Sequence, residues 1–355
     1  MRILDNIIFS LQNSGGVSAV WYEHLKRLLE DKNIDSLKFV ECDTANSNVF
    51  RKELNINRSM IQQESSRLLQ LRRYINPLFA PISDPFVFHS SYYRTSLNKY
   101  AVNITTVHDF TYEYFIKGIA KSVHCWQKYM AIRNSDLIIC VSENTKKDLL
   151  KFVPSVDANK IRVIYNGVSE DYYPIDSAGV DNSRFALFVG ARGGYKNFSV
   201  AVEAIKDTTL DLVIVGSPLS HIEIKHLDLV LGRDRYKYAG RISNKELNVL
   251  YNTAFCLLYP SSYEGFGIPV IEAQKAGCPV IAANHSSIPE IIGDKTLLVN
   301  EITPVEILKK IQYLRSDYNR SEIINFGLEN AKRFSWDKTY AETIKVYDEV
   351  NQLFK

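Results

Sequence analysis

Short apolar segments recur along the chain, and a helical pattern follows most of them. The segments lack the polar alternation of half-exposed strands, which is typical of strands buried on both faces. Strands that alternate with helices predict parallel sheets covered by helices on both sides, an α/β fold. The predicted strands are 2–9, 36–40, 86–89, 102–107, 136–141, 161–165, 185–190, 210–215, 254–259 and 280–282.

After the strand 161–165, a polar span from Asp176 to Ser183 is typical of a linker between domains. A length of 355 residues also suits two domains better than one. We therefore expect an α/β domain over 1–170, a second over 171–334, and a C-terminal segment over 335–355.

The composition indicates a soluble globular protein, with 46% hydrophobic and 23% charged residues. A formal charge of +3 gives no reason to expect a nucleic-acid partner. The five cysteines are scattered without metal-ligand spacing, so we expect reduced thiols and no bound metal. We see neither a signal peptide nor an apolar run long enough to cross a bilayer, and we expect a cytoplasmic protein.

The most informative stretch is YPSSYEGFGIPVIEAQKAGCPVIAANHSSIPE, Tyr259 to Glu290. It begins where an apolar strand ends, and ligands of open α/β sheets bind beyond such strand ends. Gly265 and Gly267 let the backbone approach a ligand closely. Pro269 suits the first turn of the next helix, whose N-terminus favours negative charge.

Two carboxylates occur in this stretch, Glu264 in the loop and Glu272 in the helix. A carboxylate accepts from two neighbouring hydroxyls, so the pair could hold a ribose diol and a sugar hydroxyl of one ligand. A hydrolase pair would lie roughly 5 to 9.5 Å apart. Eight helical residues span about 12 Å, which disfavours that alternative.

A second cluster follows the strand 185–190, where Arg192 and Lys196 bracket Gly193 and Gly194. Two cations at a helix start could clamp a diphosphate, the arginine as a fork and the lysine as a point charge. A solvated basic turn would explain the same residues. Further on, the helix start Ser287-Ile288-Pro289-Glu290 predicts a capping box.

In the first domain, Gly15 and Gly16 stand between a strand and a helix, as in phosphate-binding turns. His108 follows the strand 102–107 and could donate a hydrogen bond or act as an acid or base, because histidine titrates near neutral pH. A structural histidine explains the same position equally simply. His89 is a further histidine at a strand end, without an assigned role.

Residues 51–75 carry six basic and two acidic residues on a partly helical pattern. Basic amphipathic helices bind anionic lipid, so this segment could contact a membrane. An ordinary solvated helix face explains the pattern as well, and we favour that explanation.

The stretch around Glu264 resembles the Glu-x7-Glu signature of the retaining, nucleotide-sugar-dependent glycosyltransferases of family 4. The matching residues are Glu264, Gly265, Phe266, Gly267, Pro269, Glu272 and Ala273. The resemblance implies the GT-B fold, in which two Rossmann-like, doubly wound domains face each other across a cleft. It also implies that the C-terminal helix crosses back to the first domain.

The resemblance implies roles for individual residues. The loop Gly265, Phe266, Gly267 and Ile268 would offer amides to the donor sugar, Glu264 would lie beside the sugar, and Glu272 would bind the ribose. Arg192, Lys196, Gly15 and Gly16 would lie against the diphosphate, Arg241 could stack on the base, and His108 would reach the sugar near the reaction centre.

The implied reaction moves a sugar from a nucleotide-diphosphate donor to a hydroxyl acceptor with retention. Because no Asp-x-Asp occurs, we expect a metal-independent hexosyltransferase without a cofactor. The expected acceptor is a lipid-linked or nascent surface polysaccharide or O-antigen, with mannosyl transfer as one option. Any membrane contact would be peripheral, at the inner face. A nucleotide-sugar epimerase, a glycogen-type synthase and a non-catalytic sugar-nucleotide-binding protein remain alternatives.

Overall fold

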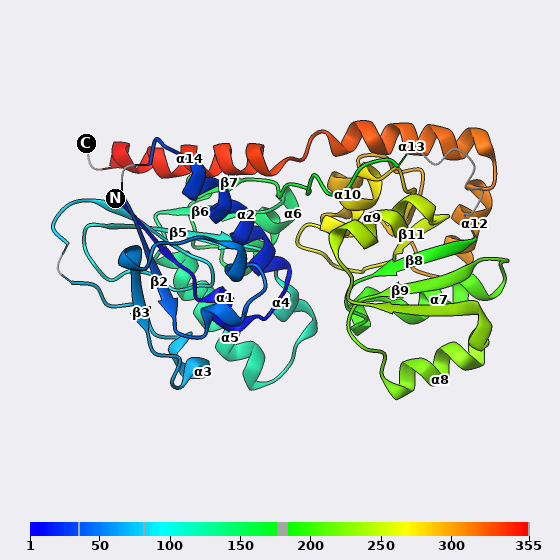
Figure 1. Cartoon of the computed structure of the whole chain (residues 1–355), viewed down its shortest axis with the longest axis horizontal. Helices are drawn as coiled ribbons and strands as arrows, with labels where there is room; N and C mark the ends of the chain where they lie inside the picture. The colour runs from blue at the N-terminus through cyan, green and yellow to red at the C-terminus, as the bar shows by residue number, and fades with distance from the viewer. Residues whose placement is uncertain (35, 81, 176–183, 354–355) are drawn as a thin grey trace. The chain divides into compact units, whose positions relative to one another are not determined.

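The computed structural model describes residues 1–34, 36–80, 82–175 and 184–353 (Figure 1). The chain divides into two compact units. Unit 1 comprises Met1–Asn166 and Trp336–Lys355, and unit 2 comprises Gly167–Ser335. The predicted linker 176–183 lies outside the described residues.

Unit 1 contains a seven-stranded sheet in the order β3-β2-β1-β4-β5-β6-β7, and every neighbouring pair is parallel. The chain builds outward from β1 to β3 and then reverses, so that β4 pairs with the other edge of β1. The strands are β1 (Arg2–Asp5), β2 (Leu37–Cys42), β3 (Ile61–Glu64), β4 (Phe86–Ser90), β5 (Ala101–Val107), β6 (Leu137–Cys140) and β7 (Ile161–Val163).

Helices cover this sheet, and the C-terminal helix is one of them. In α14, Tyr347 is buried, and its hydroxyl lies 2.7 Å from Nε2 of His24 and 2.7 Å from Nδ1 of His89. Figure 1 shows α14, in red, running alongside α2. The helices are α1 (Ile8–Leu11), α2 (Gly16–Glu30), α3 (Leu69–Arg72), α4 (Thr111–Phe115), α5 (Ile119–Arg133), α6 (Glu143–Phe152) and α14 (Trp336–Leu353).

Two local predictions in unit 1 are wrong. The first strand ends at Asp5 instead of residue 9, because the Ile7 amide bonds to the Asp5 carboxylate and the Ile8 amide to Ser91 Oγ, which starts the turn α1. The segment 51–75 is no amphipathic helix. It forms two 3-10 turns, the edge strand β3 and the single turn α3.

Unit 2 contains a six-stranded parallel sheet in the order β10-β9-β8-β11-β12-β13. The order again reverses after the third strand, so that β11 pairs with β8. Both units therefore have the doubly wound Rossmann-like topology that was predicted. The strands are β8 (Phe185–Val189), β9 (Asp211–Val215), β10 (Tyr236–Gly240), β11 (Cys256–Tyr259), β12 (Val280–Ala283) and β13 (Leu298–Val299).

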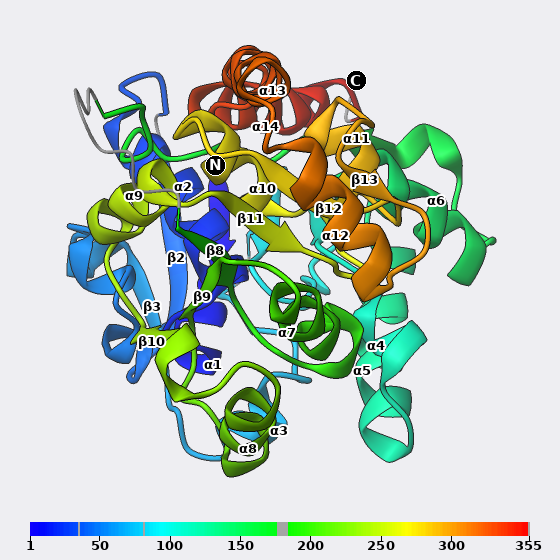
Figure 2. The same ribbon diagram turned by 90° about the vertical axis from the view of Figure 1, so that its right-hand side faces the viewer.

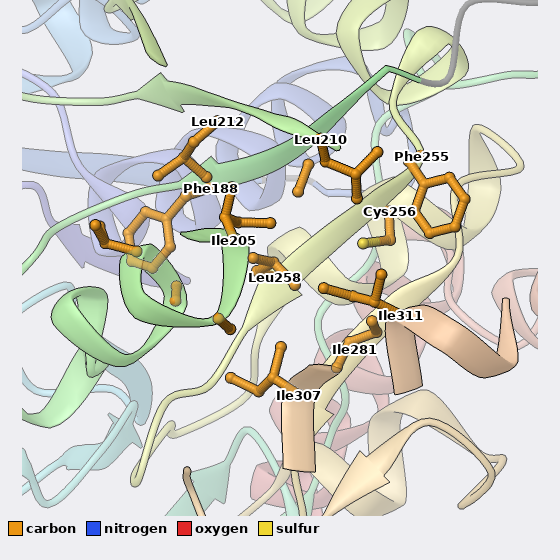
Figure 3. Close-up of a cluster of buried hydrophobic side chains, with 14 of the residues drawn as sticks. Phe188, Ile205, Leu210, Leu212, Phe255, Cys256, Leu258, Ile281, Ile307 and Ile311 are labelled. Atoms are coloured by element: carbon orange, nitrogen blue, oxygen red, sulfur yellow. The ribbon is translucent and has the colours of Figure 1, made fainter. Parts of the chain in front are cut away.

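The apolar strands of unit 2 are buried on both faces. Figure 2 shows α7 and α12 on one side of the sheet and α9 and α10 on the other. Between α7, α12 and the sheet lies the cluster of Figure 3, which includes Phe188, Ile205, Leu258 and Ile311. The helices are α7 (Phe198–Lys206), α8 (His221–Val230), α9 (Asn244–Thr253), α10 (Ile268–Lys275), α11 (Ile288–Ile292), α12 (Pro304–Tyr313) and α13 (Asp317–Ala331).

Candidate functional site

The candidate site of unit 2 lies where the strand order reverses, between β8 and β11. In open parallel sheets the loops leave these two strands in opposite directions, which opens a crevice at their carboxyl ends. The loop after β8 carries Arg192 and Lys196, and the loop after β11 carries Glu264. The sheet topology thus brings together two predicted motifs that lie some seventy residues apart in the sequence.

Lys196 and Glu264 form an ion pair that joins these two loops. Lys196 Nζ lies 2.5 Å from Glu264 Oε1, and the two side chains are 15% and 12% exposed. The ammonium also lies 5.3 Å from the ring centroid of Tyr195 and 5.6 Å from that of Tyr259. Partial burial strengthens these interactions relative to a pair in open solvent. The lysine is therefore held at the strand ends.

Asn197 ties the two loops together. Its backbone is left-handed, with φ of 52°, and asparagine tolerates this region better than most residues. Its Nδ2 donates to the Pro260 carbonyl at 2.8 Å and to Ser262 Oγ at 2.7 Å. The Ser262 amide in turn donates to the Tyr195 carbonyl at 2.7 Å. Asn197 had no predicted role, although it adjoins the predicted clamp.

Two serines after β12 hold the glycine loop from the other side. Ser286 Oγ accepts from the Glu264 amide at 2.8 Å. Ser287 Oγ, which is fully buried, lies 2.9 Å from the carbonyls of both Glu264 and Phe266. The predicted capping box at Ser287 is wrong, because this hydroxyl bonds to the loop and makes no cap bond to α11.

The glycine loop leads directly into α10, as predicted. Gly267 is the N-cap residue with φ of 105°, a conformation that strains residues with a side chain. Pro269 occupies the first turn. The loop Gly265 to Ile268 therefore stands at a helix N-terminus, where backbone amides and the helix dipole favour an anionic or strongly polar ligand.

Glu272 lies one turn further along α10 and is partly buried. Tyr251 donates a hydrogen bond to its Oε2 at 3.1 Å. Burial raises the pKa of Glu272 to about 7, although hydrogen bonds from Tyr251 and Tyr172 favour the carboxylate. The group therefore titrates near neutral pH.

Arg192 is engaged with protein groups in the structure. Its side chain is 5% exposed, and Nε lies 2.7 Å from Glu223 Oε1. Nη2 donates to the carbonyls of Ser217 and Pro218, each at 2.8 Å. Nη1 is buried without a hydrogen-bond partner among the described residues. Arg192 thus joins the loops after β8 and β9, while its Nη1 makes no hydrogen bond among the described residues.

Arg241 follows β10 and is exposed. Its Nη2 lies 3.5 Å from Ser217 Oγ, in the same loop whose carbonyl accepts from Arg192. The structure therefore gathers both arginines, Lys196, Glu264 and the glycine loop at the carboxyl edge of one sheet.

In unit 1, Gly15 and Gly16 begin α2. A side chain at Gly15 would meet Oε1 of Gln12 at 2.6 Å, and that oxygen accepts from the Ser18 amide. A side chain at Gly16 would meet nothing within 4 Å. Because the atoms near Gly15 are the far end of a flexible side chain, packing within the described chain requires glycine at neither position.

His108 follows β5 and lines a cavity of about 40 Å³ together with His24 and His89. Burial lowers the pKa of His108 to about 4, while the charge of Asp109 opposes the shift. The expectation that this histidine titrates near neutral pH is therefore wrong. It is uncharged at pH 7, so it can donate or accept a hydrogen bond and is a weaker base than an exposed histidine. His89 is structural, since its two ring nitrogens bond to Tyr347 and Thr106.

A polar cavity of about 500 Å³ lies beside β2 and β3. Within it, Arg51 and Glu41 form a buried ion pair of 2.8 Å, whereas Lys52 and Arg58 are exposed. The lining also includes Asp43, Asn46 and Gln63. Such a lining suits a hydroxylated or anionic ligand.

Over the described ranges, the structure contains no cluster of three or more His, Cys, Asp or Glu side chains that could hold a metal ion. In the same part of the chain, no helix is both long and apolar enough to traverse a membrane. All five cysteines are free and buried.

Two family models match the chain. The model described as "Glycosyltransferase Family 4" matches residues 14–172, and the model described as "Glycosyl transferases group 1" matches residues 175–336. Together they span most of both units.

Individual proteins agree with these matches. The chain is 26% identical to O-antigen chain mannosyltransferase B of Escherichia coli over 94% of this chain and 95% of that protein. It is 29% identical to O-antigen chain mannosyltransferase RfbU of Salmonella typhimurium over 64% and 66% of the two chains. Among curated relatives of unassigned activity, it is 31% identical to glycosyltransferase MJ1178 of Methanocaldococcus jannaschii over 62% of each.

Solved structures with the same fold cover nearly the whole chain. Sucrose-phosphate synthase from Thermosynechococcus elongatus matches 99% of this chain and 98% of its own, with a TM-score of 0.73 and 18% identity. Anabaena HepE in complex with UDP matches 98% and 99%, with a TM-score of 0.72 and 15% identity.

Proposed function

Because the chain belongs to the group 1 glycosyltransferases of the GT-B fold, we propose that it moves a hexose from a nucleotide-diphosphate sugar to a hydroxyl of a growing surface polysaccharide or O-antigen. The O-antigen mannosyltransferases among its relatives support this pathway class and make mannose the first sugar to test.

The observation that carries the proposal is the meeting of Lys196, Glu264 and the glycine loop at the strand reversal of unit 2. Lys196 would supply a cation for the diphosphate, and the Glu264 carboxylate would accept hydrogen bonds from the sugar hydroxyls. The N-terminus of α10 would offer backbone amides to the same donor. A donor diphosphate would compete with Glu264 for Lys196, which would release the carboxylate to accept from the sugar hydroxyls.

In the proposed reaction, the bond between the anomeric carbon and the diphosphate oxygen breaks and the acceptor oxygen bonds to that carbon on the same face. The acceptor proton passes to the departing phosphate. Lys196, the free Nη1 of Arg192 and the amides at Gly15 and Gly16 would stabilise the charge that grows on the diphosphate. These groups supply positive charge without a metal, which is why we propose metal-independent transfer.

The remaining assignments follow the same donor. Glu272 would accept from the ribose, Arg241 would stack on the base, and the loop Gly265 to Ile268 would bind the sugar. His108 would donate a hydrogen bond to the sugar as a neutral imidazole. Solved relatives in complex with UDP and sugars support a nucleotide-sugar donor.

For the acceptor, we propose a lipid-linked glycan whose sugar end enters the polar cavity at β2 and β3. Lys52 and Arg58 would meet an anionic group beside the glycan, and Asp43 and Asn46 would meet hydroxyls. A lipid-linked acceptor brings the enzyme to a membrane surface.

The test is transfer itself. Purified protein is incubated in EDTA with UDP-, GDP- and ADP-sugars and a synthetic lipid-linked acceptor, and the product is analysed by mass spectrometry and by NMR of the anomeric proton. We expect one new glycosidic bond with the donor's anomeric configuration. Inversion, or activity that requires manganese, would contradict the mechanism. Conversion of the donor without an acceptor would favour an epimerase, and binding without any reaction would favour a non-catalytic protein.

A further inference from the structure

The long helix α5 of unit 1 carries an apolar stripe that points away from the protein. Ile119, Val123, Trp126 and Met130 are 83%, 36%, 58% and 39% exposed. At about 100° per residue these four positions fall within about 60° of the helix circumference. The buried face of α5 lies on the other side and consists of His124, Cys125, Gln127, Lys128, Ala131 and Ile132. The stripe is therefore additional to the face that α5 uses for folding.

A second exposed apolar segment lies beside α5. Around α3, four side chains are 59% to 79% exposed, namely Leu68, Leu71, Ile75 and Leu78. The Gln127 side chain of α5 donates to the Arg73 carbonyl, and Tyr74 and Trp126 line one small cavity. Figure 1 shows α3 and α5 at the same end of unit 1. The two segments thus form one surface, which we name the α5 face.

The charges on the α5 face have one sign. Residues 65–80 and 114–134 contain no aspartate or glutamate. Arg67, Lys117 and Arg133 are exposed there. Eight exposed apolar side chains surrounded by cations are unfavourable in water, whereas such a surface is complementary to the headgroups and acyl chains of an anionic bilayer.

We propose that the α5 face docks on anionic lipid, with α5 lying in the plane of the interface and Trp126 at headgroup depth. Tryptophan favours this depth because its ring is apolar and its N–H is polar. The proposal deepens the proposed function, because it would hold the enzyme where a lipid-linked acceptor is embedded. It keeps the part of 51–75 around α3 and leaves out Met60 and Ile61, which pack against the core.

The first experiment is vesicle flotation with phosphatidylcholine alone and with phosphatidylcholine plus phosphatidylglycerol. We expect binding to the anionic vesicles that weakens with salt. Ile119→Glu with Trp126→Glu should lower the partition coefficient about tenfold or more. The matched control is Ile222→Glu with Leu229→Glu on α8 of unit 2, where both side chains are above 80% exposed. This control should bind vesicles like the parent protein.

Tryptophan fluorescence reports the docking directly. Trp126 is the exposed one of three tryptophans, since Trp21 and Trp336 are 5% and 7% exposed. Brominated lipid should quench its emission, and Trp126→Phe should remove the quenching while vesicle binding persists.

Vesicle binding that the α5 variants leave unchanged, or no binding at all, would overturn the proposal. So would concentration-dependent dimers that disappear in the α5 variant, because the face would then bind a second copy of the chain. Transfer to a water-soluble acceptor analogue separates the two claims. The α5 variant should retain this transfer. If the parent protein shows no such transfer, that result would count against the proposed function alone.

Discussion

The pKa of Glu272 makes donor binding testable through pH. Ribose hydroxyls donate to a carboxylate, so the ionised form should bind the donor better. With a pKa of about 7, the ionised fraction falls roughly tenfold between pH 8 and pH 6. We expect the dissociation constant of the nucleotide sugar to rise by about that factor over this range. In Glu272→Gln it should be independent of pH.

The same shift affects stability with a defined sign. The pKa of Glu272 is raised on folding from 4.5 to about 7, so the folded state binds the proton more tightly. This favours the folded state fully below pH 4.5, and the contribution is lost as pH rises through 7. The loss is of order 3 kcal/mol at most. The unfolding free energy of the parent protein should therefore decline from pH 5 to pH 8 relative to Glu272→Gln.

The assay is isothermal titration calorimetry with a nucleotide sugar in place of a free nucleoside diphosphate, whose terminal phosphate itself titrates near pH 6. Tyr251→Phe is the matched perturbation. It removes a hydrogen bond to the carboxylate and should move the midpoint of the pH dependence upward. A parent protein whose affinity is the same at pH 6 and pH 8 would refute the assignment of Glu272 to the ribose.

Four further outcomes are expected. Ser287→Ala should lower the unfolding free energy by about 1–3 kcal/mol in chemical denaturation, because it removes a buried donor from the glycine loop, and a loss below about 0.5 kcal/mol would contradict that role. Lys196→Ala should weaken nucleoside diphosphate binding about tenfold or more in a thermal-shift titration, and unchanged affinity would show that the lysine serves only Glu264. Lys52→Ala with Arg58→Ala should raise the acceptor KM while leaving the donor KM unchanged, and an effect on the donor alone would remove the acceptor from the β2–β3 cavity. Activity should survive EDTA, and recovery only with manganese would contradict the metal-free diphosphate site.

Much of the fold follows from local pattern. The buried strands are short and uninterrupted, and the alternation with helices leaves few arrangements other than parallel doubly wound sheets. The cap at Ser142 and the capping box from Ser243 to Glu246 depend only on neighbours within one turn. The predicted end of the strand 2–9 is wrong because the Ile8 amide bonds to Ser91, a residue more than eighty positions away.

Site residues could be predicted only where the residue type and its place in the local pattern indicate the chemistry. Glycines, cations and carboxylates at strand ends predicted the motifs around Lys196 and Glu264. Asn197 had no predicted role and Ser287 was assigned a wrong one, because their contacts depend on loops that meet only in the folded chain. A stripe such as that of α5 has the spacing of a buried helix face, so its exposure could not be recognised from sequence.

The central claim is that Glu264 acts on the sugar in a crevice that also binds the diphosphate. The most direct test measures turnover and nucleoside diphosphate affinity of Glu264→Ala beside the parent protein, in EDTA, with the donor that gives transfer. We predict a fall in turnover of 100-fold or more, of order 3 kcal/mol in transition-state stabilisation, with a change in affinity below about threefold. Unchanged turnover would contradict the assignment of Glu264, and with it the account of this site.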